Sequence, residues 1–200
     1  MSVSKRLCLS DFLEKSAQIH KHLCPKQVLG VRMGIMAGEL LNFPPPQTNN
    51  KRIFVFMETD GCTATGVAVA TGCSIYRRTM RIMDYGKVAI TCVDTLTNRA
   101  YRILPHKNSR QRAQALQPNA KSRWHAYLYA YQQMPTDHLL TAYPVTISVD
   151  LAQIISKPTA RTNCDDCGEE IMNQREVIEG NKILCQSCVG NRYYLDVTSE

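Results

Sequence analysis

Long apolar runs are absent from this sequence of 200 residues. No stretch of about 18 or more uncharged apolar residues occurs, which excludes a transmembrane helix of ordinary length. The N-terminal residues Met1–Arg6 also lack the apolar segment of a secretory signal peptide. We therefore expect a cytoplasmic protein with no membrane partner.

The sequence also lacks the even number of cysteines that a framework of disulfides needs. The chain has nine cysteines, and no export signal directs them to an oxidising compartment. Four of the nine fall in two CxxC pairs, a spacing typical of metal ligands. Reduced thiols are therefore the better interpretation, and the hydrophobic content of 44% is that of an ordinary globular protein.

Acidic residues are fewer than basic ones, and the formal net charge is +7. Much of the excess lies in two segments, Arg77–Arg81 and Lys107–Arg123. Dispersed basic residues more often form a solvated face than a binding surface. Charge alone therefore keeps nucleic-acid binding as an alternative function and does not favour it.

The stretch His20–Pro25 (His-Lys-His-Leu-Cys-Pro) places two imidazoles and a thiol at alternate positions before a predicted helix. Pro25 suits the first helical position, where its missing N–H costs nothing, and periodic apolar residues follow it. Cys24 is then expected at a helix N-terminus, whose partial positive charge lowers the pKa of a thiol. His20, His22 and Cys24 are candidate catalytic residues that could instead bind a metal.

The competing interpretation is that both histidines are surface residues and that Cys24 is a small buried hydrophobe. Three such residues before a proline-started helix are rarer than a lone cysteine, so we favour a functional site. Without a fourth ligand, the motif does not decide between metal binding and acid–base chemistry.

The hydrophobic pattern predicts both helices and strands. Asp11 and Glu14 resemble a capping box that begins the first helix, and Gly30, Gly34 and Gly38 form a stripe along the second that lets another backbone approach closely. The remaining predicted elements are strands at Arg52–Glu58, Thr79–Asp84, Lys87–Asp94, Arg99–Leu104 and Pro144–Val149, a helix at Thr63–Gly72, two helical pieces within Pro105–Thr136, and a short element at Asp150–Ile155. The strands between Thr79 and Leu104 are expected to form an antiparallel meander.

An aromatic stripe lies in the second helical piece of Pro105–Thr136. It consists of Trp124, Tyr127, Leu128 and Tyr131, which have the spacing of one helical face. Such a stripe is more often core or a dimer contact than a platform for stacking bases.

The segment Glu58–Cys62 (Glu-Thr-Asp-Gly-Cys) follows a predicted buried strand. Strand ends that face the next helix commonly hold reactive groups, so Cys62 is a candidate second thiol of the core site. Asp60 or Glu58 could orient a histidine. A polar turn without chemistry is about as common at such a place.

The pairs Cys164–Cys167 and Cys185–Cys188 are separated by the 17 residues 168–184. This spacing predicts one tetrahedral zinc bound by Cys164, Cys167, Cys185 and Cys188. Four cysteine ligands leave no open position, so the zinc is structural. A terminal helix after Gly190 would make the module treble-clef-like, and such modules bind nucleic acid or protein.

Together these patterns predict an α+β fold, in which an antiparallel or mixed sheet packs with helices, plus a small four-cysteine zinc module. The polar, proline-containing segment Ser156–Thr162 indicates a domain boundary. We place the core domain at residues 1–157 and the zinc-binding module at residues 158–200.

Several motifs in succession resemble those of the FmdE family, whose members are components of molybdenum- or tungsten-dependent formylmethanofuran dehydrogenase. They are His20–Pro25 with Gly30–Gly34, Glu58–Cys62, Thr71–Ser74 and Asp84–Lys87. The chain departs from the family pattern at Lys21 and Lys26, where glycines are expected, and at Thr65, where an acidic residue is usual.

The resemblance implies an α+β core, a homodimer, and a polar site built from His20, His22, Cys24 and Cys62, with a second metal at His20, His22 and Cys24. It also implies association with formylmethanofuran dehydrogenase subunits in the reduction of carbon dioxide during methanogenesis. Asp60 and Lys87, which lie in the matching motifs, are the candidates for cofactor binding. The chain is then an oxidoreductase-associated subunit, and catalysis by the chain itself does not follow from the resemblance.

Overall fold

The computed structural model describes residues 8–44, 46–47, 51–154, 159–195 and 197. It divides into two compact units, residues 1–148 and residues 149–200. The predicted domain boundary after residue 157 lies outside the described residues. None of the helices in the described part of the chain has the length and apolar content needed to span a bilayer.

A five-stranded mixed sheet forms the first unit, with the order β2-β1-β3-β4-β5. Its strands are β1 (Ile53–Met57), β2 (Met80–Ile82), β3 (Ile90–Asp94), β4 (Ala100–Pro105) and β5 (Leu140–Val145). The strands β1, β3, β4 and β5 pair antiparallel, whereas β2 pairs parallel with β1. The predicted α+β class with a mixed sheet is confirmed.

The expected antiparallel meander from Thr79 to Leu104 is wrong at its first strand. β2 lies on the other side of β1 from β3, with Val55 opposite Met80 on one side and opposite Cys92 on the other. The reason is the helix between β1 and β2, because a helical crossover returns the chain parallel to the strand it left. The last strand also begins earlier than predicted, at Leu140 rather than Pro144.

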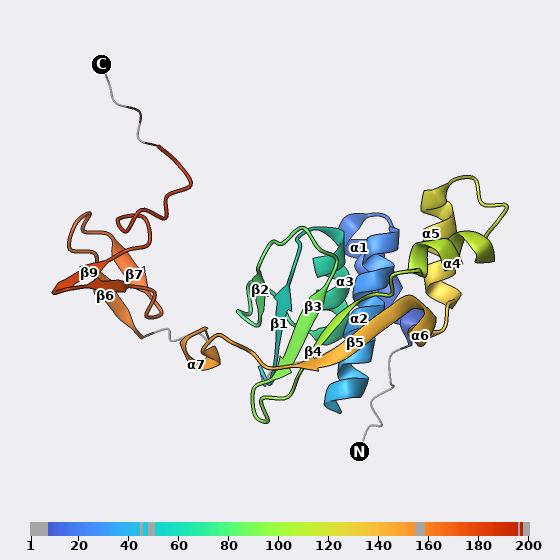
Figure 1. The fold of residues 1–200 in the computed structure, drawn as a ribbon, viewed down its shortest axis with the longest axis horizontal. Helices are drawn as coiled ribbons and strands as arrows, with labels where there is room; N and C mark the ends of the chain where they lie inside the picture. Colours follow the sequence, from blue (N-terminus) through green and yellow to red (C-terminus); the bar gives the residue numbers. More distant parts are fainter. Residues whose placement is uncertain (1–7, 45, 48–50, 155–158, 196, 198–200) are drawn as a thin grey trace. The chain divides into compact units, whose positions relative to one another are not determined.

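Three helices cover one face of this sheet (Figure 1). They are α1 (Leu9–His20), α2 (Pro25–Leu41) and α3 (Cys62–Thr71). Helix α1 begins earlier than the predicted cap at Asp11, because Cys8 is the N-cap and Asp11 is the acidic member of the box that accepts the Cys8 N–H at 2.8 Å. Side chains of all three helices join Ile53, Val55 and Met57 of β1 in one apolar core.

Three further helices lie beside α2, at the right of Figure 1. They are α4 (Ser109–Leu116), α5 (Arg123–Gln133) and the short α6 (Thr136–Leu139). The two predicted helical pieces are therefore confirmed. Tyr131 is buried and Tyr127 packs against the core, but Trp124 is 44% exposed and does not belong to the buried face.

The second unit contains α7 (Leu151–Ile154) and two small hairpins. One hairpin joins β6 (Arg161–Asn163) to β7 (Glu170–Met172), and the other joins β8 (Val177–Glu179) to β9 (Lys182–Leu184). Its apolar cluster has three buried residues, Cys164, Ile171 and Leu184. The described residues 191–195 form no helix, so the treble-clef-like terminal helix is not confirmed.

Candidate functional site

The turn between α1 and α2 presents the predicted His20–Pro25 motif. His20 ends α1, Lys21 follows in the left-handed region with φ of 60°, and Pro25 is the first residue of α2. A left-handed φ is strained for lysine and free of strain for glycine, so Lys21 occupies a position that suits glycine. The turn reverses the chain within a few residues and sets Cys24 as the N-cap of α2.

Helices α2 and α3 pack closely through glycines. A Cβ added at Gly30 would lie 3.1 Å from the Cα of Gly66, and one at Gly34 would lie 2.6 Å from the Cβ of Ala70. The predicted close approach is therefore confirmed at Gly30 and Gly34. Because the contacts advance in the same direction along both helices, α2 and α3 run parallel and their N-termini lie side by side.

This packing brings Cys24 and Cys62 together from positions 38 residues apart in the sequence. Cys24 is the N-cap of α2, and Cys62 is the first residue of α3. The Cys62 thiol lies close enough to the Cys24 thiol to contribute to its raised pKa. The first unit therefore contains a dithiol at the N-termini of two parallel helices.

Cys24 is 8% exposed, and burial raises the pKa of its thiol above the ordinary value, with a smaller contribution from Cys62. The expectation that the helix N-terminus lowers the pKa of Cys24 is wrong in its sign. Hydrogen bonds from the backbone N–H groups of Gln27 and Lys26 do favour the thiolate, but desolvation is the larger effect. Cys24 is therefore a protonated thiol at neutral pH.

Gln27 holds Cys24 in place and was not predicted. Its amide oxygen accepts the Cys24 N–H at 2.7 Å, and its amide nitrogen donates to the Ser16 carbonyl at 3.0 Å and contacts the Ser16 hydroxyl at 3.1 Å. This is a capping box with Cys24 as N-cap and Gln27 three residues later. The spacing Cys-x-x-Gln could have revealed it, because glutamine is a usual third-position partner.

The histidines have partners other than those predicted. His20 Nε2 lies 2.8 Å from the Thr65 hydroxyl of α3, one turn after Cys62. His22 Nδ1 lies 2.9 Å from the His20 carbonyl, and the two imidazole rings are 5.9 Å apart, edge to face. Thr65 is thus the residue that orients His20.

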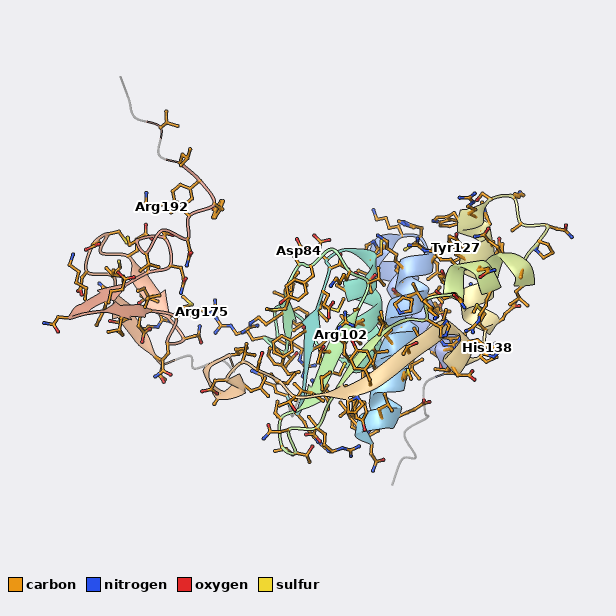
Figure 2. The ribbon with its side chains drawn as sticks, viewed as in Figure 1. Asp84, Arg102, Tyr127, His138, Arg175 and Arg192 are labelled. Carbon is orange, nitrogen blue, oxygen red and sulfur yellow. The ribbon has the colours of Figure 1, made fainter. Side chains whose placement is uncertain are left out.

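Glu58 does not orient a histidine. Both of its carboxylate oxygens accept hydrogen bonds at 2.6 Å from Arg102 of β4, which is labelled in Figure 2. The same guanidinium donates to the Tyr143 hydroxyl at 2.6 Å. The Glu58 side chain is 8% exposed, and its carboxylate raises the pKa of Arg102. Glu58 therefore belongs to a charged network within the sheet.

Asp60 is exposed and is not hydrogen-bonded to a histidine among the described residues. Lys87 is exposed as well, and its ammonium lies 6.0 Å from the centre of the Tyr85 ring. Their role in cofactor binding stays a prediction. Beside Cys62, the buried Thr63 hydroxyl has no hydrogen-bond partner within the described structure.

A metal at the core site requires several donors around one point. Within the described residues, the only group of three or more potential ligands whose donor atoms lie within 4.8 Å of one another is the C-terminal cysteine set. In the core, His20 Nε2 is directed to Thr65 rather than to the thiols. The residues of the predicted second metal site are therefore not arranged to hold a metal.

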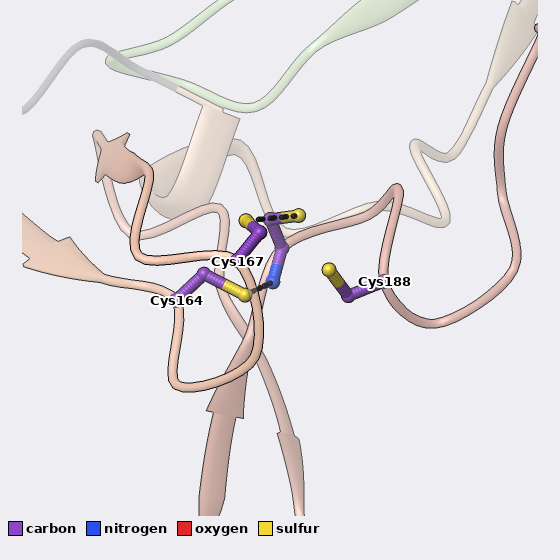
Figure 3. A group of neighbouring side chains, drawn as sticks. Cys164, Cys167 and Cys188 are labelled. Atoms are coloured by element: carbon purple, nitrogen blue, oxygen red, sulfur yellow. Dashed lines mark hydrogen bonds between the residues drawn. The ribbon is translucent and has the colours of Figure 1, made fainter. Parts of the chain in front are cut away.

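The four cysteines of the second unit are arranged to hold one (Figure 3). The sulfurs of Cys167 and Cys185 are 3.9 Å apart, close to the separation of about 3.8 Å expected for two thiolates on one tetrahedral zinc with Zn–S bonds of about 2.3 Å. The predicted ligand set Cys164, Cys167, Cys185 and Cys188 is thus brought together in space.

The electrostatics of the four cysteines also favour a bound cation. Backbone N–H groups, first that of Cys167, lower the pKa of the Cys164 thiol to about 6. Neighbouring sulfurs, first that of Cys185, raise the pKa of Cys188 to about 12. Four adjacent thiols do not all ionise without a positive charge between them, and zinc supplies that charge.

A solved structure and a curated protein resemble this chain over most of its length. A tungsten formylmethanofuran dehydrogenase FmdE-like protein from Syntrophus aciditrophicus has a similar fold, with a TM-score of 0.58, 18% identity, and coverage of 98% of this chain and 100% of that one. A probable S-adenosyl-L-methionine-binding protein of Archaeoglobus fulgidus is 26% identical to this chain. The alignment is 206 residues long and covers 92% of this chain. This chain spans about half of that relative, because the alignment covers 54% of it.

Family models match both units. Residues 158–194 match the prokaryotic dksA/traR C4-type zinc finger, in agreement with the cysteine geometry. Residues 19–141 match the model described as FmdE, molybdenum formylmethanofuran dehydrogenase operon. Because that match covers more than half of the sequence and contains the whole Cys24–Cys62 site, the chain belongs to the FmdE family.

Proposed function

We propose that this protein is an accessory component or relative of molybdenum- or tungsten-dependent formylmethanofuran dehydrogenase, and that the Cys24–Cys62 dithiol performs its chemistry. The observation that supports the second part is the meeting of two thiols at adjacent helix N-termini. Family membership supports the first part. The role belongs to the reduction of carbon dioxide to formylmethanofuran in methanogenesis.

The dithiol is suited to reversible oxidation. Two neighbouring thiols can form one intramolecular disulfide, releasing two protons and two electrons to an external disulfide that becomes two thiols. Burial keeps Cys24 protonated, so the attack begins when Cys24 or Cys62 loses its proton. His20, held against α3 by Thr65 one turn after Cys62, is the proposed proton carrier for this step.

The zinc of the second unit has a structural role in this proposal. Its four cysteine ligands leave no position for substrate. The dithiol and the zinc site are therefore chemically separate. Oxidation of the dithiol can be measured while the zinc stays bound.

The experiment is oxidation of the zinc-loaded chain with glutathione disulfide, followed by mass spectrometry of the intact protein and of its peptides. The expected product is a Cys24–Cys62 disulfide that lacks two hydrogen atoms and reverts with dithiothreitol. Cys24→Ser and Cys62→Ser should each abolish it, while the exposed Cys8→Ser serves as the control and should leave it unchanged. Oxidation that spares this pair while the zinc remains bound would refute the dithiol role.

Association is tested separately. We propose a homodimer in the cytoplasm that binds formylmethanofuran dehydrogenase subunits, as family membership suggests. Light scattering of the purified chain should give the mass of two chains. Mixing with a purified formylmethanofuran dehydrogenase that lacks its FmdE component should produce a complex on gel filtration, and a failure to form that complex would refute the accessory role without affecting the dithiol chemistry.

A further inference from the structure

The segment from Thr95 to Thr136 contains no aspartate or glutamate. It includes β4, α4, the loop after α4, and α5. The exposed cations of its α4–α5 hairpin are Lys107, Arg110, Lys121 and Arg123. No carboxylate forms an ion pair with any of these four in the part of the chain that the structure describes. Positive charge on this surface is therefore not neutralised locally.

A recess of about 270 Å³ opens at the loop end of this hairpin. Its lining residues are Gln117, Asn119, Ala120, Lys121, His125 and Tyr129. The lining combines two aromatic rings, one cation and two amides, and it contains no acid. Pockets for drug-sized ligands begin at about 300 Å³, so the recess suits a single planar ring with a charged group attached.

The rings beside this recess point away from the core. Trp124 is 44% and Tyr129 is 47% exposed, and the His125 ring centre lies 5.0 Å from that of Trp124 and 6.2 Å from that of Tyr129. Ser122, the N-cap of α5, contacts His125 Nδ1 at 2.9 Å and so fixes the imidazole. Three neighbouring aromatic rings thus form an exposed, partly rigid surface.

The inward side of the same helix has a different role. Tyr127, which is labelled in Figure 2, stacks on Tyr131 with the ring centres 5.7 Å apart, and its hydroxyl accepts a hydrogen bond from Gln114 of α4 at 3.0 Å. These two rings hold α5 against α4 and the core. The outward rings Trp124 and Tyr129 have no comparable structural task, since they are left half exposed.

We propose that this recess binds a nucleobase that carries a phosphate, as a free nucleotide or as one unit of a single-stranded nucleic acid. The base stacks on Tyr129 and His125, and the phosphate lies against Lys121, with Arg123 as the next cation along the chain. Aromatic stacking accepts every base because each has a π-face, and cations beside the rings attract the backbone. The Gln117 and Asn119 amides can donate to and accept from the edge of the base.

Trp124 provides the measurement, because it is the single tryptophan of the chain and lies beside the recess. Its fluorescence is recorded while the full zinc-loaded chain is titrated with oligouridylate, oligoadenylate or adenosine monophosphate. We expect quenching that saturates and that weakens between about 50 and 200 mM salt, since counterions are released on binding. Tighter binding of the oligonucleotides identifies a single strand as the source, and equal binding identifies the free nucleotide.

Variants test the two parts of the site separately. Tyr129→Ala should weaken binding at least about fivefold, the lower end of one stacked base. Lys121→Gln should weaken it and lower the slope of log affinity against log salt by about 0.7, the value for one contact with a single strand. The controls are Tyr76→Ala, which removes a tyrosine that is 87% exposed outside the recess, and Lys15→Gln on the surface of α1. Both should bind as the parent chain does.

Three results would overturn the proposal. One is the absence of saturable quenching with every nucleotide probe. Another is equal weakening by Tyr76→Ala and Tyr129→Ala, which would indicate non-specific attraction to the basic surface. The third is Trp124 emission that changes with protein concentration alone, which would assign this face to a second copy of the chain. Circular dichroism confirms the fold of each variant, and the half-exposed Tyr129 and exposed Lys121 can be replaced without opening the core.

Discussion

The two units of this protein bring cysteines together in opposite ways. In the first unit, Cys24 and Cys62 meet because two helices pack closely around an extensive apolar core. In the second unit, the apolar cluster has only three buried residues, and four cysteines converge within 4.8 Å. In the first unit, helix packing brings the thiols together. In the second unit, we expect zinc bound by the thiols to stabilise the fold.

The largest expected effect is the response of the units to metal removal. A strong zinc chelator should unfold residues 159–195 and leave the first unit folded, because zinc binding contributes about 10–16 kcal/mol to small zinc modules and nothing to the apolar core. Hydrogen exchange measured by mass spectrometry resolves the two units in the intact chain. Protection should vanish around β6–β9 and persist in β1, β3 and β4.

The control is Cys185→Ser, compared with Cys24→Ser. Elemental analysis should find one zinc per chain in the parent and in Cys24→Ser, and none in Cys185→Ser. A second metal that disappears with Cys24 would contradict the comparison, because it would make the first thiol site a metal site as well.

The same difference explains what could be predicted from the sequence. The zinc ligands Cys164, Cys167, Cys185 and Cys188 follow from local spacing, since each pair lies in one turn and a short hairpin connects the pairs. The α2 start at Pro25 and the close approach at Gly30 are also local signals. These features were predicted correctly because each leaves a pattern within one short segment, although the pattern at Gly30 does not identify the helix that approaches it.

The features that were missed depend on residues distant in sequence. The partner of Glu58 is Arg102, 44 residues away, and the partner of His20 is Thr65, 45 residues away. The sign of the Cys24 pKa shift depends on burial by the packed helices, which outweighs the local helix terminus. The parallel pairing of β2 depends on the crossover through α3. No periodic pattern in one segment contains this information.

The next largest effect concerns charge pairs in the two units. Arg102→Leu leaves the Glu58 carboxylate, 8% exposed, without its partner, and should lower the free energy of unfolding of the first unit by about 3 kcal/mol. Urea denaturation measures this loss. Adding Glu58→Gln to Arg102→Leu should recover most of it.

The matched change in the second unit is Arg161→Leu, which breaks an ion pair with Glu170 whose side chains are 56% and 46% exposed. It should cost less than about 1 kcal/mol. An equal loss from Arg102→Leu and Arg161→Leu would show that the sheet network does not behave as a buried pair.

A smaller effect tests the glycine contact that aligns the thiols. Gly34→Ala places its new methyl group 2.6 Å from the Cβ of Ala70, and should lower the free energy of unfolding by about 1–3 kcal/mol and reduce the yield of the Cys24–Cys62 disulfide. The double variant Gly34→Ala with Ala70→Gly makes room again and should recover part of both losses. If the disulfide yield does not follow stability in these variants, helix packing does not set the distance between the thiols.

The smallest effect is the loss of stability of the first unit in acid. This loss has a different origin from the pH sensitivity of the zinc site in the second unit. Hydrogen bonds from Arg52 hold the pKa of the buried Asp94 carboxyl below its ordinary value, and the Leu96 N–H helps. A carboxyl whose pKa is lower in the folded state adds stability above its unfolded pKa of about 3.9, and this stability is lost as the pH falls through the folded pKa. The free energy of unfolding of the parent should therefore fall below about pH 4 more steeply than that of Asp94→Asn.

Denaturation followed by Trp124 fluorescence measures the first unit alone, and Arg52→Gln should remove most of the difference. Parallel acid curves for the parent and Asp94→Asn would show that this ion pair adds nothing to the stability of the packed core.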